Sequence, residues 1–164
     1  MTTGFEIRPV RPDDVPTLLG LIRKLAEYEK LLDSVTATEA DFHAALFGPR
    51  PFAEALLGIH QERAVGYAIY FHNFSTFLGQ PGLYIEDIFV EKEFRGRGFG
   101  KALILRLVEI ARERKCGRVE WTALNWNEPA LRFYRGLGAE VLSEWQILRL
   151  DRAGIERLGS PTHE

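Results

Sequence analysis

The stretch "FRGRGFGKAL", residues 94–103, separates an apolar strand pattern from an amphipathic helix pattern. The strand pattern is "GLYIEDIFV" at 82–90, and the helix carries apolar residues at Leu103, Leu107, Val108, Ile110 and Ala111. Small residues at such a junction let the backbone approach an anion closely, and the first N–H groups of the helix point toward it. The stretch therefore predicts an α/β protein with a phosphate-binding loop.

Two common phosphate motifs do not fit this loop. The P-loop template ends in Gly-Lys followed by Ser or Thr, but Arg95 stands at its first glycine and Ala102 replaces the hydroxyl residue that would bind magnesium. The dinucleotide template matches at Gly96 and Gly98 but meets Lys101 at its third glycine. The remaining pattern is R-x-x-G-x-G, and from loop composition alone a plain tight turn with solvated arginines stays a second interpretation.

The chain before the loop predicts one strand, two helices and three strands. The first strand is 5–9, and a helix capped by Asp13 or Asp14 runs to about Lys30. A shorter helix begins at a capping box, either Thr36 with Glu39 or Thr38 with Asp41. Two strands at 51–60 and 64–74 form a hairpin around the polar "QER", and the strand at 82–90 follows.

The chain after the loop predicts helix, strand, helix and one or two further strands. The first helix runs to about Arg114, and a strand follows at 118–124. Asn127 caps the next helix, which Gly136 or Gly138 ends, and "VLSEWQILRL" at 141–150 reads as strand. This order predicts a mixed, mostly antiparallel sheet flanked by helices. We expect one domain over 1–158 and a flexible tail at 159–164.

Composition narrows the function classes. The 164 residues carry 21 basic and 23 acidic side chains, a net charge of −2 without a basic block, which argues against nucleic-acid binding. The single Cys116 indicates a reducing compartment, and the scattered His residues predict no metal site. The sequence has neither an apolar run of about 18 residues nor a signal-peptide pattern, so we expect a cytoplasmic protein without membrane association.

Two separate segments resemble the GNAT N-acetyltransferases. The pattern Arg95-x-x-Gly98-x-Gly100 between a strand and a helix is similar to the acetyl-CoA pyrophosphate signature of that family. The segment "NWNEPALRFYRGLGA", 125–139, resembles its second cofactor segment, in which an Asn opens a helix and a Tyr follows two turns later. The resemblance implies the GNAT-type acyl-CoA N-acyltransferase fold, with acetyl-CoA as co-substrate.

The resemblance also implies which residues contact acetyl-CoA. They belong to the strand before the loop, to the loop itself and to the start of the second helix: Ile88, Phe89, Val90, Arg95, Gly96, Arg97, Gly98, Phe99, Gly100, Lys101, Asn127, Pro129 and Ala130. In the family the strand at 82–90 carries a bulge and splays from its neighbour. A backbone N–H there, which we assign to Ile88, polarises the acetyl carbonyl.

Further matches, "LAEYEK", "LYIEDIFV" and "WNEPALRFY", resemble the diamine (spermidine/spermine) and thialysine acetyltransferase branch. That branch implies a homodimer and a small amine acceptor. Tyr134 is then the general acid that protonates the leaving thiolate, since a phenol pKa near 10 lies above that of a thiol. Glu86 is the candidate base and also binds the acceptor amine, together with Tyr28, Glu29, Asp87 and Glu144.

Each of these residues also has an ordinary structural explanation. Tyr134 is also an ordinary core aromatic, and Asn127 also an ordinary N-cap. Glu86 fits a solvent-facing acid, and Glu29 fits a solvated helix residue. The segment after Ala139 is shorter than in the polyamine enzymes, which leaves the acceptor open among a diamine, an amino acid, an aminoglycoside and a protein amine. A non-catalytic acetyl-CoA-binding module is the alternative from another class.

Overall fold

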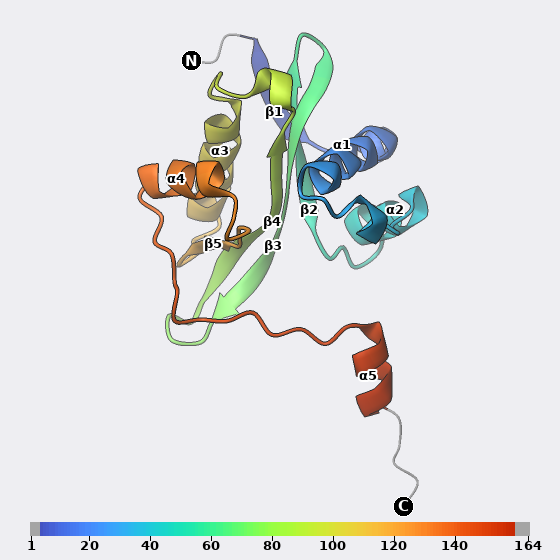
Figure 1. Cartoon of the computed structure of the whole chain (residues 1–164), viewed down its shortest axis with the longest axis vertical. Helices are drawn as coiled ribbons and strands as arrows, with labels where there is room; N and C mark the ends of the chain where they lie inside the picture. Colours follow the sequence, from blue (N-terminus) through green and yellow to red (C-terminus); the bar gives the residue numbers. More distant parts are fainter. Residues whose placement is uncertain (1–3, 160–164) are drawn as a thin grey trace, which may run out of the picture. The chain divides into compact units, whose positions relative to one another are not determined.

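The computed structural model describes residues 4–159 (Figure 1). Its strands are β1 (Phe5–Pro9), β2 (Glu54–His60), β3 (Arg63–Ser75), β4 (Gln80–Val90) and β5 (Val119–Trp121). Its α-helices are α1 (Val15–Tyr28), α2 (Glu39–Phe47), α3 (Phe99–Glu113), α4 (Glu128–Gly136) and α5 (Arg152–Gly159). Short 3-10 turns lie at Pro12–Asp14, Leu32–Ser34 and Lys92–Phe94. The α/β class and the order of elements up to α4 confirm the sequence-based prediction.

The strands form one mixed sheet in the order β1-β2-β3-β4-β5. The first three pairs are antiparallel, and β4 pairs with β5 in parallel through the crossover helix α3. The β2–β3 hairpin turns at Gln61 and Glu62, which both take left-handed backbone angles with φ of 48° and 64°. Two residues with φ > 0 are the geometry that matches the twist of a tight hairpin. The mostly antiparallel sheet is therefore as predicted.

Helices cover both faces of this sheet (Figure 1). On one face α1 and α2 pack on a buried cluster of Leu18, Leu21, Leu57, Tyr67 and Phe89 with their neighbours. On the other face α3 packs through Phe99, Leu103 and Leu107 against Val65, Leu83 and Ile85. Each helix buries one apolar stripe because its hydrophobic residues recur at helical spacing.

Local signals placed several helix ends correctly. Thr38, rather than Thr36, caps α2, and its hydroxyl accepts a hydrogen bond from the Asp41 amide while the Asp41 carboxylate accepts one from the Thr38 amide. Asn127 caps α4 by accepting from the Ala130 amide at 3.4 Å. The last helical residue is Gly136, and Gly138 follows it with φ of 90°. Such reciprocal caps are readable from sequence because both partners lie within one turn.

The prediction of a final strand at 141–150 was wrong. In the described part of the chain this segment is irregular, and Trp145, Ile147 and Leu148 are exposed. Apolar alternation predicts a strand only where the backbone finds a ladder partner, and the pattern does not name one. The helix α5 that follows was not predicted, although Asp151 caps it by accepting from the Gly154 amide at 2.8 Å. Gly159 ends α5, and the rest of the expected tail lies outside the described residues.

The chain divides into two compact units at Thr122 and Ala123. The first unit holds the sheet with α1, α2 and α3, and the second holds α4, the irregular segment and α5.

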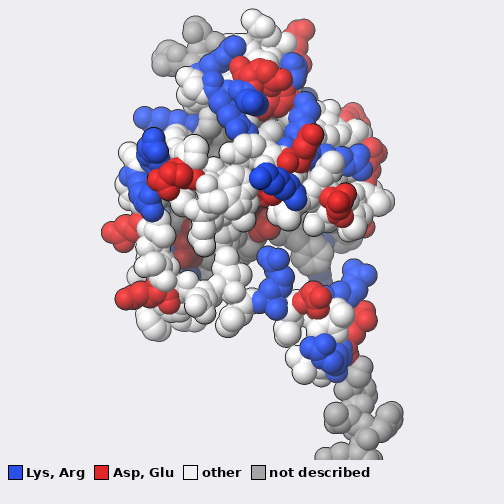
Figure 2. Space-filling view, in the orientation of Figure 1, with Lys and Arg blue, Asp and Glu red and all other residues white. Residues whose placement is uncertain are grey.

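Lys and Arg side chains are interspersed with Asp and Glu on the face shown in Figure 2. No α-helix among residues 4–159 is long and apolar enough to span a membrane.

One buried carboxylate joins three parts of the first unit. Glu91 follows β4 directly, and only 4% of its side chain is exposed. It forms ion pairs with Lys24 of α1 and with Arg63 at the start of β3, and its amide donates to the Val65 carbonyl at 2.8 Å. A buried acid is stable only when cations and hydrogen bonds compensate its desolvation. Glu91 therefore anchors the root of the Gly-rich loop to α1 and to the β2–β3 hairpin.

We expect the double variant Lys24→Gln/Arg63→Gln to lose about 3–5 kcal/mol of unfolding free energy, because it leaves Glu91 buried without a cation. Urea unfolding followed by circular dichroism measures this loss. Adding Glu91→Gln to the double variant should recover part of it. Arg106→Gln, which removes an exposed partner of Glu109, is the control and should cost less than about 1 kcal/mol. A double variant as stable as that control would contradict the anchoring role.

Candidate active site

The Gly-rich loop presents backbone amides at the start of α3. Gly96 and Gly98 have φ of 76° and 83°, angles that residues with a Cβ rarely adopt. Gly98 is the N-cap of α3 and supplies no side-chain cap, and the first helical bond runs from the Ala102 amide to the Gly98 carbonyl. The amides of Phe99, Gly100 and Lys101 precede that bond, so they have no partner within the helix. This end of α3 has the geometry of an anion site.

The side chains of the loop are engaged with the protein itself. The Arg95 guanidinium lies 4.6 Å from the ring centre of Tyr28 and 5.7 Å from that of Phe89, and its Nε donates to the Val90 carbonyl at 3.0 Å. Arg97 lies 5.2 Å from the ring centre of Phe94. Both arginines are exposed, so these contacts orient the guanidinium groups against aromatic rings without removing them from solvent.

Phe99 belongs to the core rather than to the loop surface. Its ring is 4% exposed and stacks on Phe5 with centroids 4.1 Å apart. Only its backbone is therefore placed for a ligand. Lys101 is exposed in the first turn of α3, and Gly100 is half-buried.

A bulge in β4 reverses the side-chain alternation of the strand. Ile69 pairs with Asp87 but the next residue, Tyr70, pairs with Ile85, so Glu86 is the extra residue. Before the bulge Ile85 packs on the α3 side, and after it Phe89 packs on the α1 side. In a regular strand, Ile85 and Phe89 would point to the same face because side chains alternate from one residue to the next. One unpaired residue between them moves the later side chains to the opposite face. The bulge expected from the family resemblance is confirmed.

The edge of β4 is open after the bulge. Pairing with β5 runs only from Leu83 to Ile85, opposite Val119 to Trp121. Within residues 4–159, the stretch 86–90 has no strand partner on the β5 side, although it stays paired with β3 on the other. Ile88, Phe89 and Val90 lie in this stretch. Their open edge has the backbone groups that an extended ligand needs for hydrogen bonding.

Three acids gather near the bulge, in different environments. Glu86 is exposed, whereas Asp87 is half-buried and accepts a hydrogen bond from the Tyr67 hydroxyl at 3.0 Å. Burial raises the pKa of Asp87, the Tyr67 hydrogen bond lowers it, and the Glu86 charge raises it. Burial, followed by the charge of Asp87, raises the pKa of Glu29 at the end of α1. The structure therefore brings Glu29 close enough to Asp87 for their charges to interact, and their role in binding an acceptor stays a prediction.

The second unit carries the other predicted residues. Asn127, Pro129 and Ala130 form the first turn of α4. Tyr134 lies seven residues after Asn127, in the second turn of α4. Tyr134 is half-buried, with the Phe133 ring 5.4 Å away between centroids. The helix predicted after Asn127 is therefore confirmed, and the cofactor-binding roles of these residues stay predictions.

Two further residues were singled out from the sequence. Glu144 is exposed in the irregular segment and does not lie on a strand. Cys116 is half-buried against the α3 side of the core, consistent with a structural residue. Among residues 4–159, no group of three His, Cys, Asp or Glu side chains is arranged to hold a metal ion.

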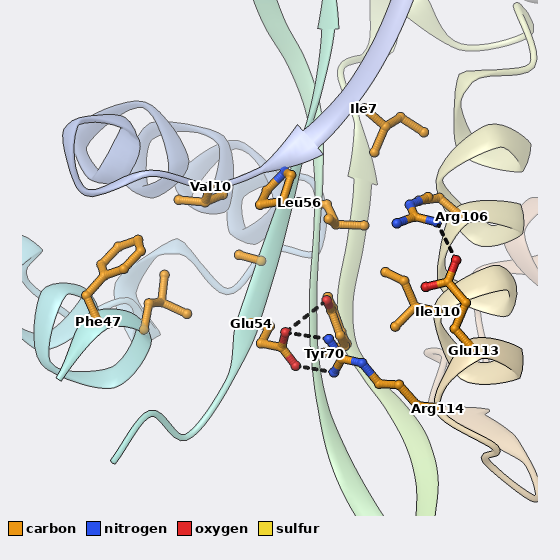
Figure 3. A pocket seen from close by; sticks show the side chains of 13 residues that line it. Ile7, Val10, Phe47, Glu54, Leu56, Tyr70, Arg106, Ile110, Glu113 and Arg114 are labelled. Carbon is orange, nitrogen blue, oxygen red and sulfur yellow. Dashed lines mark hydrogen bonds and ion pairs between the residues drawn. The ribbon is translucent and has the colours of Figure 1, made fainter. Parts of the chain in front are cut away.

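A separate cavity of about 340 Å³ lies near the end of β1, between α2 and α3 (Figure 3). None of the predicted site residues lines it. Glu54 accepts hydrogen bonds from Arg114 at 2.5 and 2.8 Å and from the Tyr70 hydroxyl at 3.4 Å, and Arg106 pairs with Glu113. Because these charges are already paired with one another, nothing in this cavity points to a charged ligand.

The strand, glycine loop and helix, with the open strand edge beside them, define an acetyltransferase. The chain belongs to the GNAT family: the family model described as "Acetyltransferase (GNAT) family" matches residues 22–139.

Similar proteins extend over nearly the whole chain. The thialysine N-epsilon-acetyltransferase of Bos taurus is 36% identical over 163 residues, which cover 93% of this chain and 95% of that protein. The L-ornithine N5-acetyltransferase of Arabidopsis thaliana is 29% identical and covers 93% of this chain and 86% of its own length. Among solved structures, an integron cassette protein from the mobile metagenome of V. cholerae superposes with a TM-score of 0.81 at 26% identity, over 97% of this chain and 99% of that one.

Sequence reasoning missed two residues of the site. Tyr67, which binds Asp87, was read only as part of a strand, and Glu91 was not singled out at all. Glu91 follows the apolar strand directly, and an acid at that position is the sequence feature that indicates a paired, buried carboxylate. The partnership of Tyr67 and Asp87 was not readable, because it depends on the position of the bulge.

We expect Asp87→Asn to raise the unfolding free energy at pH 7 by about 0.5–2 kcal/mol, the usual range for one stabilising substitution. The pKa of Asp87 is raised in the folded state. Protonated Asp87 therefore adds to the unfolding free energy below the unfolded-state pKa, and this contribution is lost as the pH rises through the folded-state pKa. Above its folded-state pKa the folded protein bears a half-buried carboxylate at Asp87, which asparagine removes. Urea unfolding at pH 7 and at about pH 4 measures the effect, which should shrink at the lower pH.

Asp14→Asn is the control of opposite sign. Asp14 accepts two hydrogen bonds from Arg8, at 2.6 and 2.9 Å, which hold its pKa low. Ionised Asp14 therefore adds to the unfolding free energy above the unfolded-state pKa, and this contribution is lost as the pH falls through the folded-state pKa. This variant should lose about 1 kcal/mol at pH 7. Equal losses of unfolding free energy at pH 7 for both variants would contradict the conclusion that the Asp87 carboxylate destabilises the folded protein at that pH.

Proposed function

We propose that this protein moves the acetyl group of acetyl-CoA to a primary amine of a small cationic acceptor, such as a diamine, a polyamine or a thialysine-like molecule. The amine attacks the thioester directly while both substrates are bound. The observation that carries the proposal is the bulge in β4. It leaves an open strand edge leading to the Gly-rich loop, and it turns Asp87 toward the α1 side, where its charge acts on Glu29 at the end of α1.

The residues of the loop fit a pyrophosphate group. The amides of Phe99, Gly100 and Lys101 stand at the positive end of a 15-residue helix, and Gly98 adds no side chain to block their approach. Arg95 and Arg97 contribute positive charge beside them. The open edge at 88–90 would hold the pantetheine arm. Asn127, Pro129 and Ala130 are assigned to the cofactor from the resemblance alone. The Ile88 amide is the proposed donor to the acetyl carbonyl.

The acid group fits a cationic acceptor. An alkyl amine has a pKa near 10.4 and arrives as ammonium, so carboxylates bind it and a base must then accept its proton. Asp87 and Glu29, whose charges interact, would bind the ammonium, together with Tyr28 at the end of α1. Glu86 is exposed and so reaches solvent, which suits proton removal through a water molecule. Glu144 is assigned to the far end of the acceptor from the resemblance alone.

The names of the relatives support this acceptor class. Thialysine and L-ornithine are both small amino acids with a second amine at the end of a side chain, and these relatives are named for acetylating that amine. An acceptor with two ammonium groups matches a site with more than one acid. The homodimer and the cytoplasmic location remain inferences from the sequence and its resemblance to the family.

A panel of amines with acetyl-CoA, followed by thiol release, tests the proposal. We expect diamines, thialysine and ornithine to be acetylated faster than an aminoglycoside, a neutral amino acid or a peptide N-terminus. Preference for one of the latter would assign another acceptor. Acetyl-CoA binding without thiol release on any amine would instead support a non-catalytic binding module.

Gly98→Val should abolish acetyl-CoA binding in calorimetry, because valine at a φ of 83° forces the loop out of its conformation. Gly79→Val is the matched control, since Gly79 also has a positive φ, of 63°, but lies in the β3–β4 turn. It should lose comparable stability and keep its affinity. Normal affinity in the Gly98 variant would remove the loop from the cofactor site.

Tyr134→Phe should lower kcat by at least about tenfold with little change in the KM for acetyl-CoA, because it removes the proton donor to the leaving thiolate and keeps the ring. Steady-state kinetics with the best amine of the panel measures both constants. Tyr70→Phe, whose hydroxyl contacts Glu54 in the separate cavity, is the control. An unchanged kcat would exclude Tyr134 from the chemical step.

A further inference from the structure

Tyr67 is a fully buried tyrosine whose hydroxyl donates a hydrogen bond to one carboxylate. Its exposure is 0%, and its ring packs in the apolar layer under α1, 6.1 Å from the Phe89 ring between centroids. Within the buried cluster of that layer, Tyr67 is the only side chain with a polar atom. That hydroxyl donates to Asp87 Oδ2 at 3.0 Å. Burying a hydroxyl is unfavourable without such a partner, so the two groups depend on each other.

The bulge is what brings the two groups together. Tyr67 pairs with Phe89 across the sheet, and Ile69 pairs with Asp87, so Tyr67 and Asp87 are diagonal neighbours on β3 and β4. Diagonal positions on one face lie within reach of a long side chain. Because Glu86 shifts the phase of β4, Asp87 faces the α1 side, where Tyr67 is.

Asp87 has no cation of its own. Among the described residues its side chain makes the hydrogen bond to Tyr67 and no ion pair, unlike the buried Glu91 with its two cations. The titratable groups that act on it are Tyr67 from β3, Glu86 from β4 and Glu29 from the end of α1. Two of these are acids, and Tyr67 is the one that favours the charged carboxylate.

We propose that Tyr67 is a positioning residue for the acceptor amine: its hydroxyl holds Asp87 as a carboxylate and fixes Oδ2, so that Oδ1 is directed to an ammonium group. This inference rests on the proposed function, because it assumes a cationic acceptor. It names a residue that does not touch the substrate and acts through Asp87. The proton that leaves the acceptor does not pass to Tyr67, which stays protonated throughout.

The first arm of the test needs no substrate. Titration of ¹³C-labelled aspartate carboxyls by NMR follows Asp87 in the wild type, in Tyr67→Phe and in Tyr70→Phe, with Asp87→Asn assigning the signal. Loss of the Tyr67 hydroxyl removes a bond that stabilises the carboxylate, so the midpoint of Asp87 should rise. Tyr70→Phe removes a hydroxyl from the other face of the same strand and should leave the midpoint unchanged. An unmoved midpoint in Tyr67→Phe would overturn the inference.

The second arm uses the best amine of the panel. In Tyr67→Phe the acidic limb of kcat/KM should move to higher pH, and at pH 7 the KM for the amine should rise about fivefold or more while kcat changes little. Tyr70→Phe should change neither. A moved NMR midpoint with an unmoved acidic limb would overturn the role in acceptor binding and leave the acetyltransferase proposal intact. If no amine reacts, the proposed acceptor class fails, and the NMR arm still tests the link between Tyr67 and Asp87.

A double variant guards against a general packing defect. If Tyr67 acts through Asp87, adding Tyr67→Phe to Asp87→Asn should raise the KM for the amine by less than about twofold beyond Asp87→Asn alone. Additive losses in the double variant would show that Tyr67 acts independently of Asp87. Because Asp87→Asn is expected to stabilise the fold, this background also keeps the comparison measurable if Tyr67→Phe alone is unstable.

Discussion

One extra residue in β4 sets the arrangement of everything around it. With Glu86 unpaired opposite β3, Ile85 faces α3 while Asp87 and Phe89 face α1. The same point marks the end of pairing with β5. An acid on the buried side and an open backbone edge therefore arise from a single irregularity, because a bulge both shifts the phase of a strand and bends it away from a neighbour.

The loop that follows β4 is supported by the core on which it stands. Glu91 ties its root to α1 and to the β2–β3 hairpin, while Arg95 lies against Tyr28 and Phe89. Residues assigned to the donor and residues assigned to the acceptor thus share contacts within one unit. The rigidity of a helix-based site is what allows a few backbone amides to bind an anion selectively.

Most of the fold was readable from local signals. The capping pairs at Thr38 and Asn127 and the glycine loop lie within short stretches of sequence. The segment 141–150 was not predictable, since its apolar alternation says nothing about a partner strand. For the site, the residue types were predicted, but the burial of Asp87 and its bond to Tyr67 were not, because both follow from where the bulge falls. Register is a property of two strands together, and one strand's sequence does not contain it.

The aromatic rings beside Arg95 and Arg97 affect the entropy that these side chains lose when a ligand binds. The guanidinium groups of Arg95 and Arg97 lie 4.6 and 5.2 Å from the ring centres of Tyr28 and Phe94. Their rotamer entropy is lost when the chain folds, so little of it remains to be lost on association. Such preorganisation slows dissociation more than it speeds encounter, so an anion that binds at the loop would meet guanidinium groups whose positions are already set.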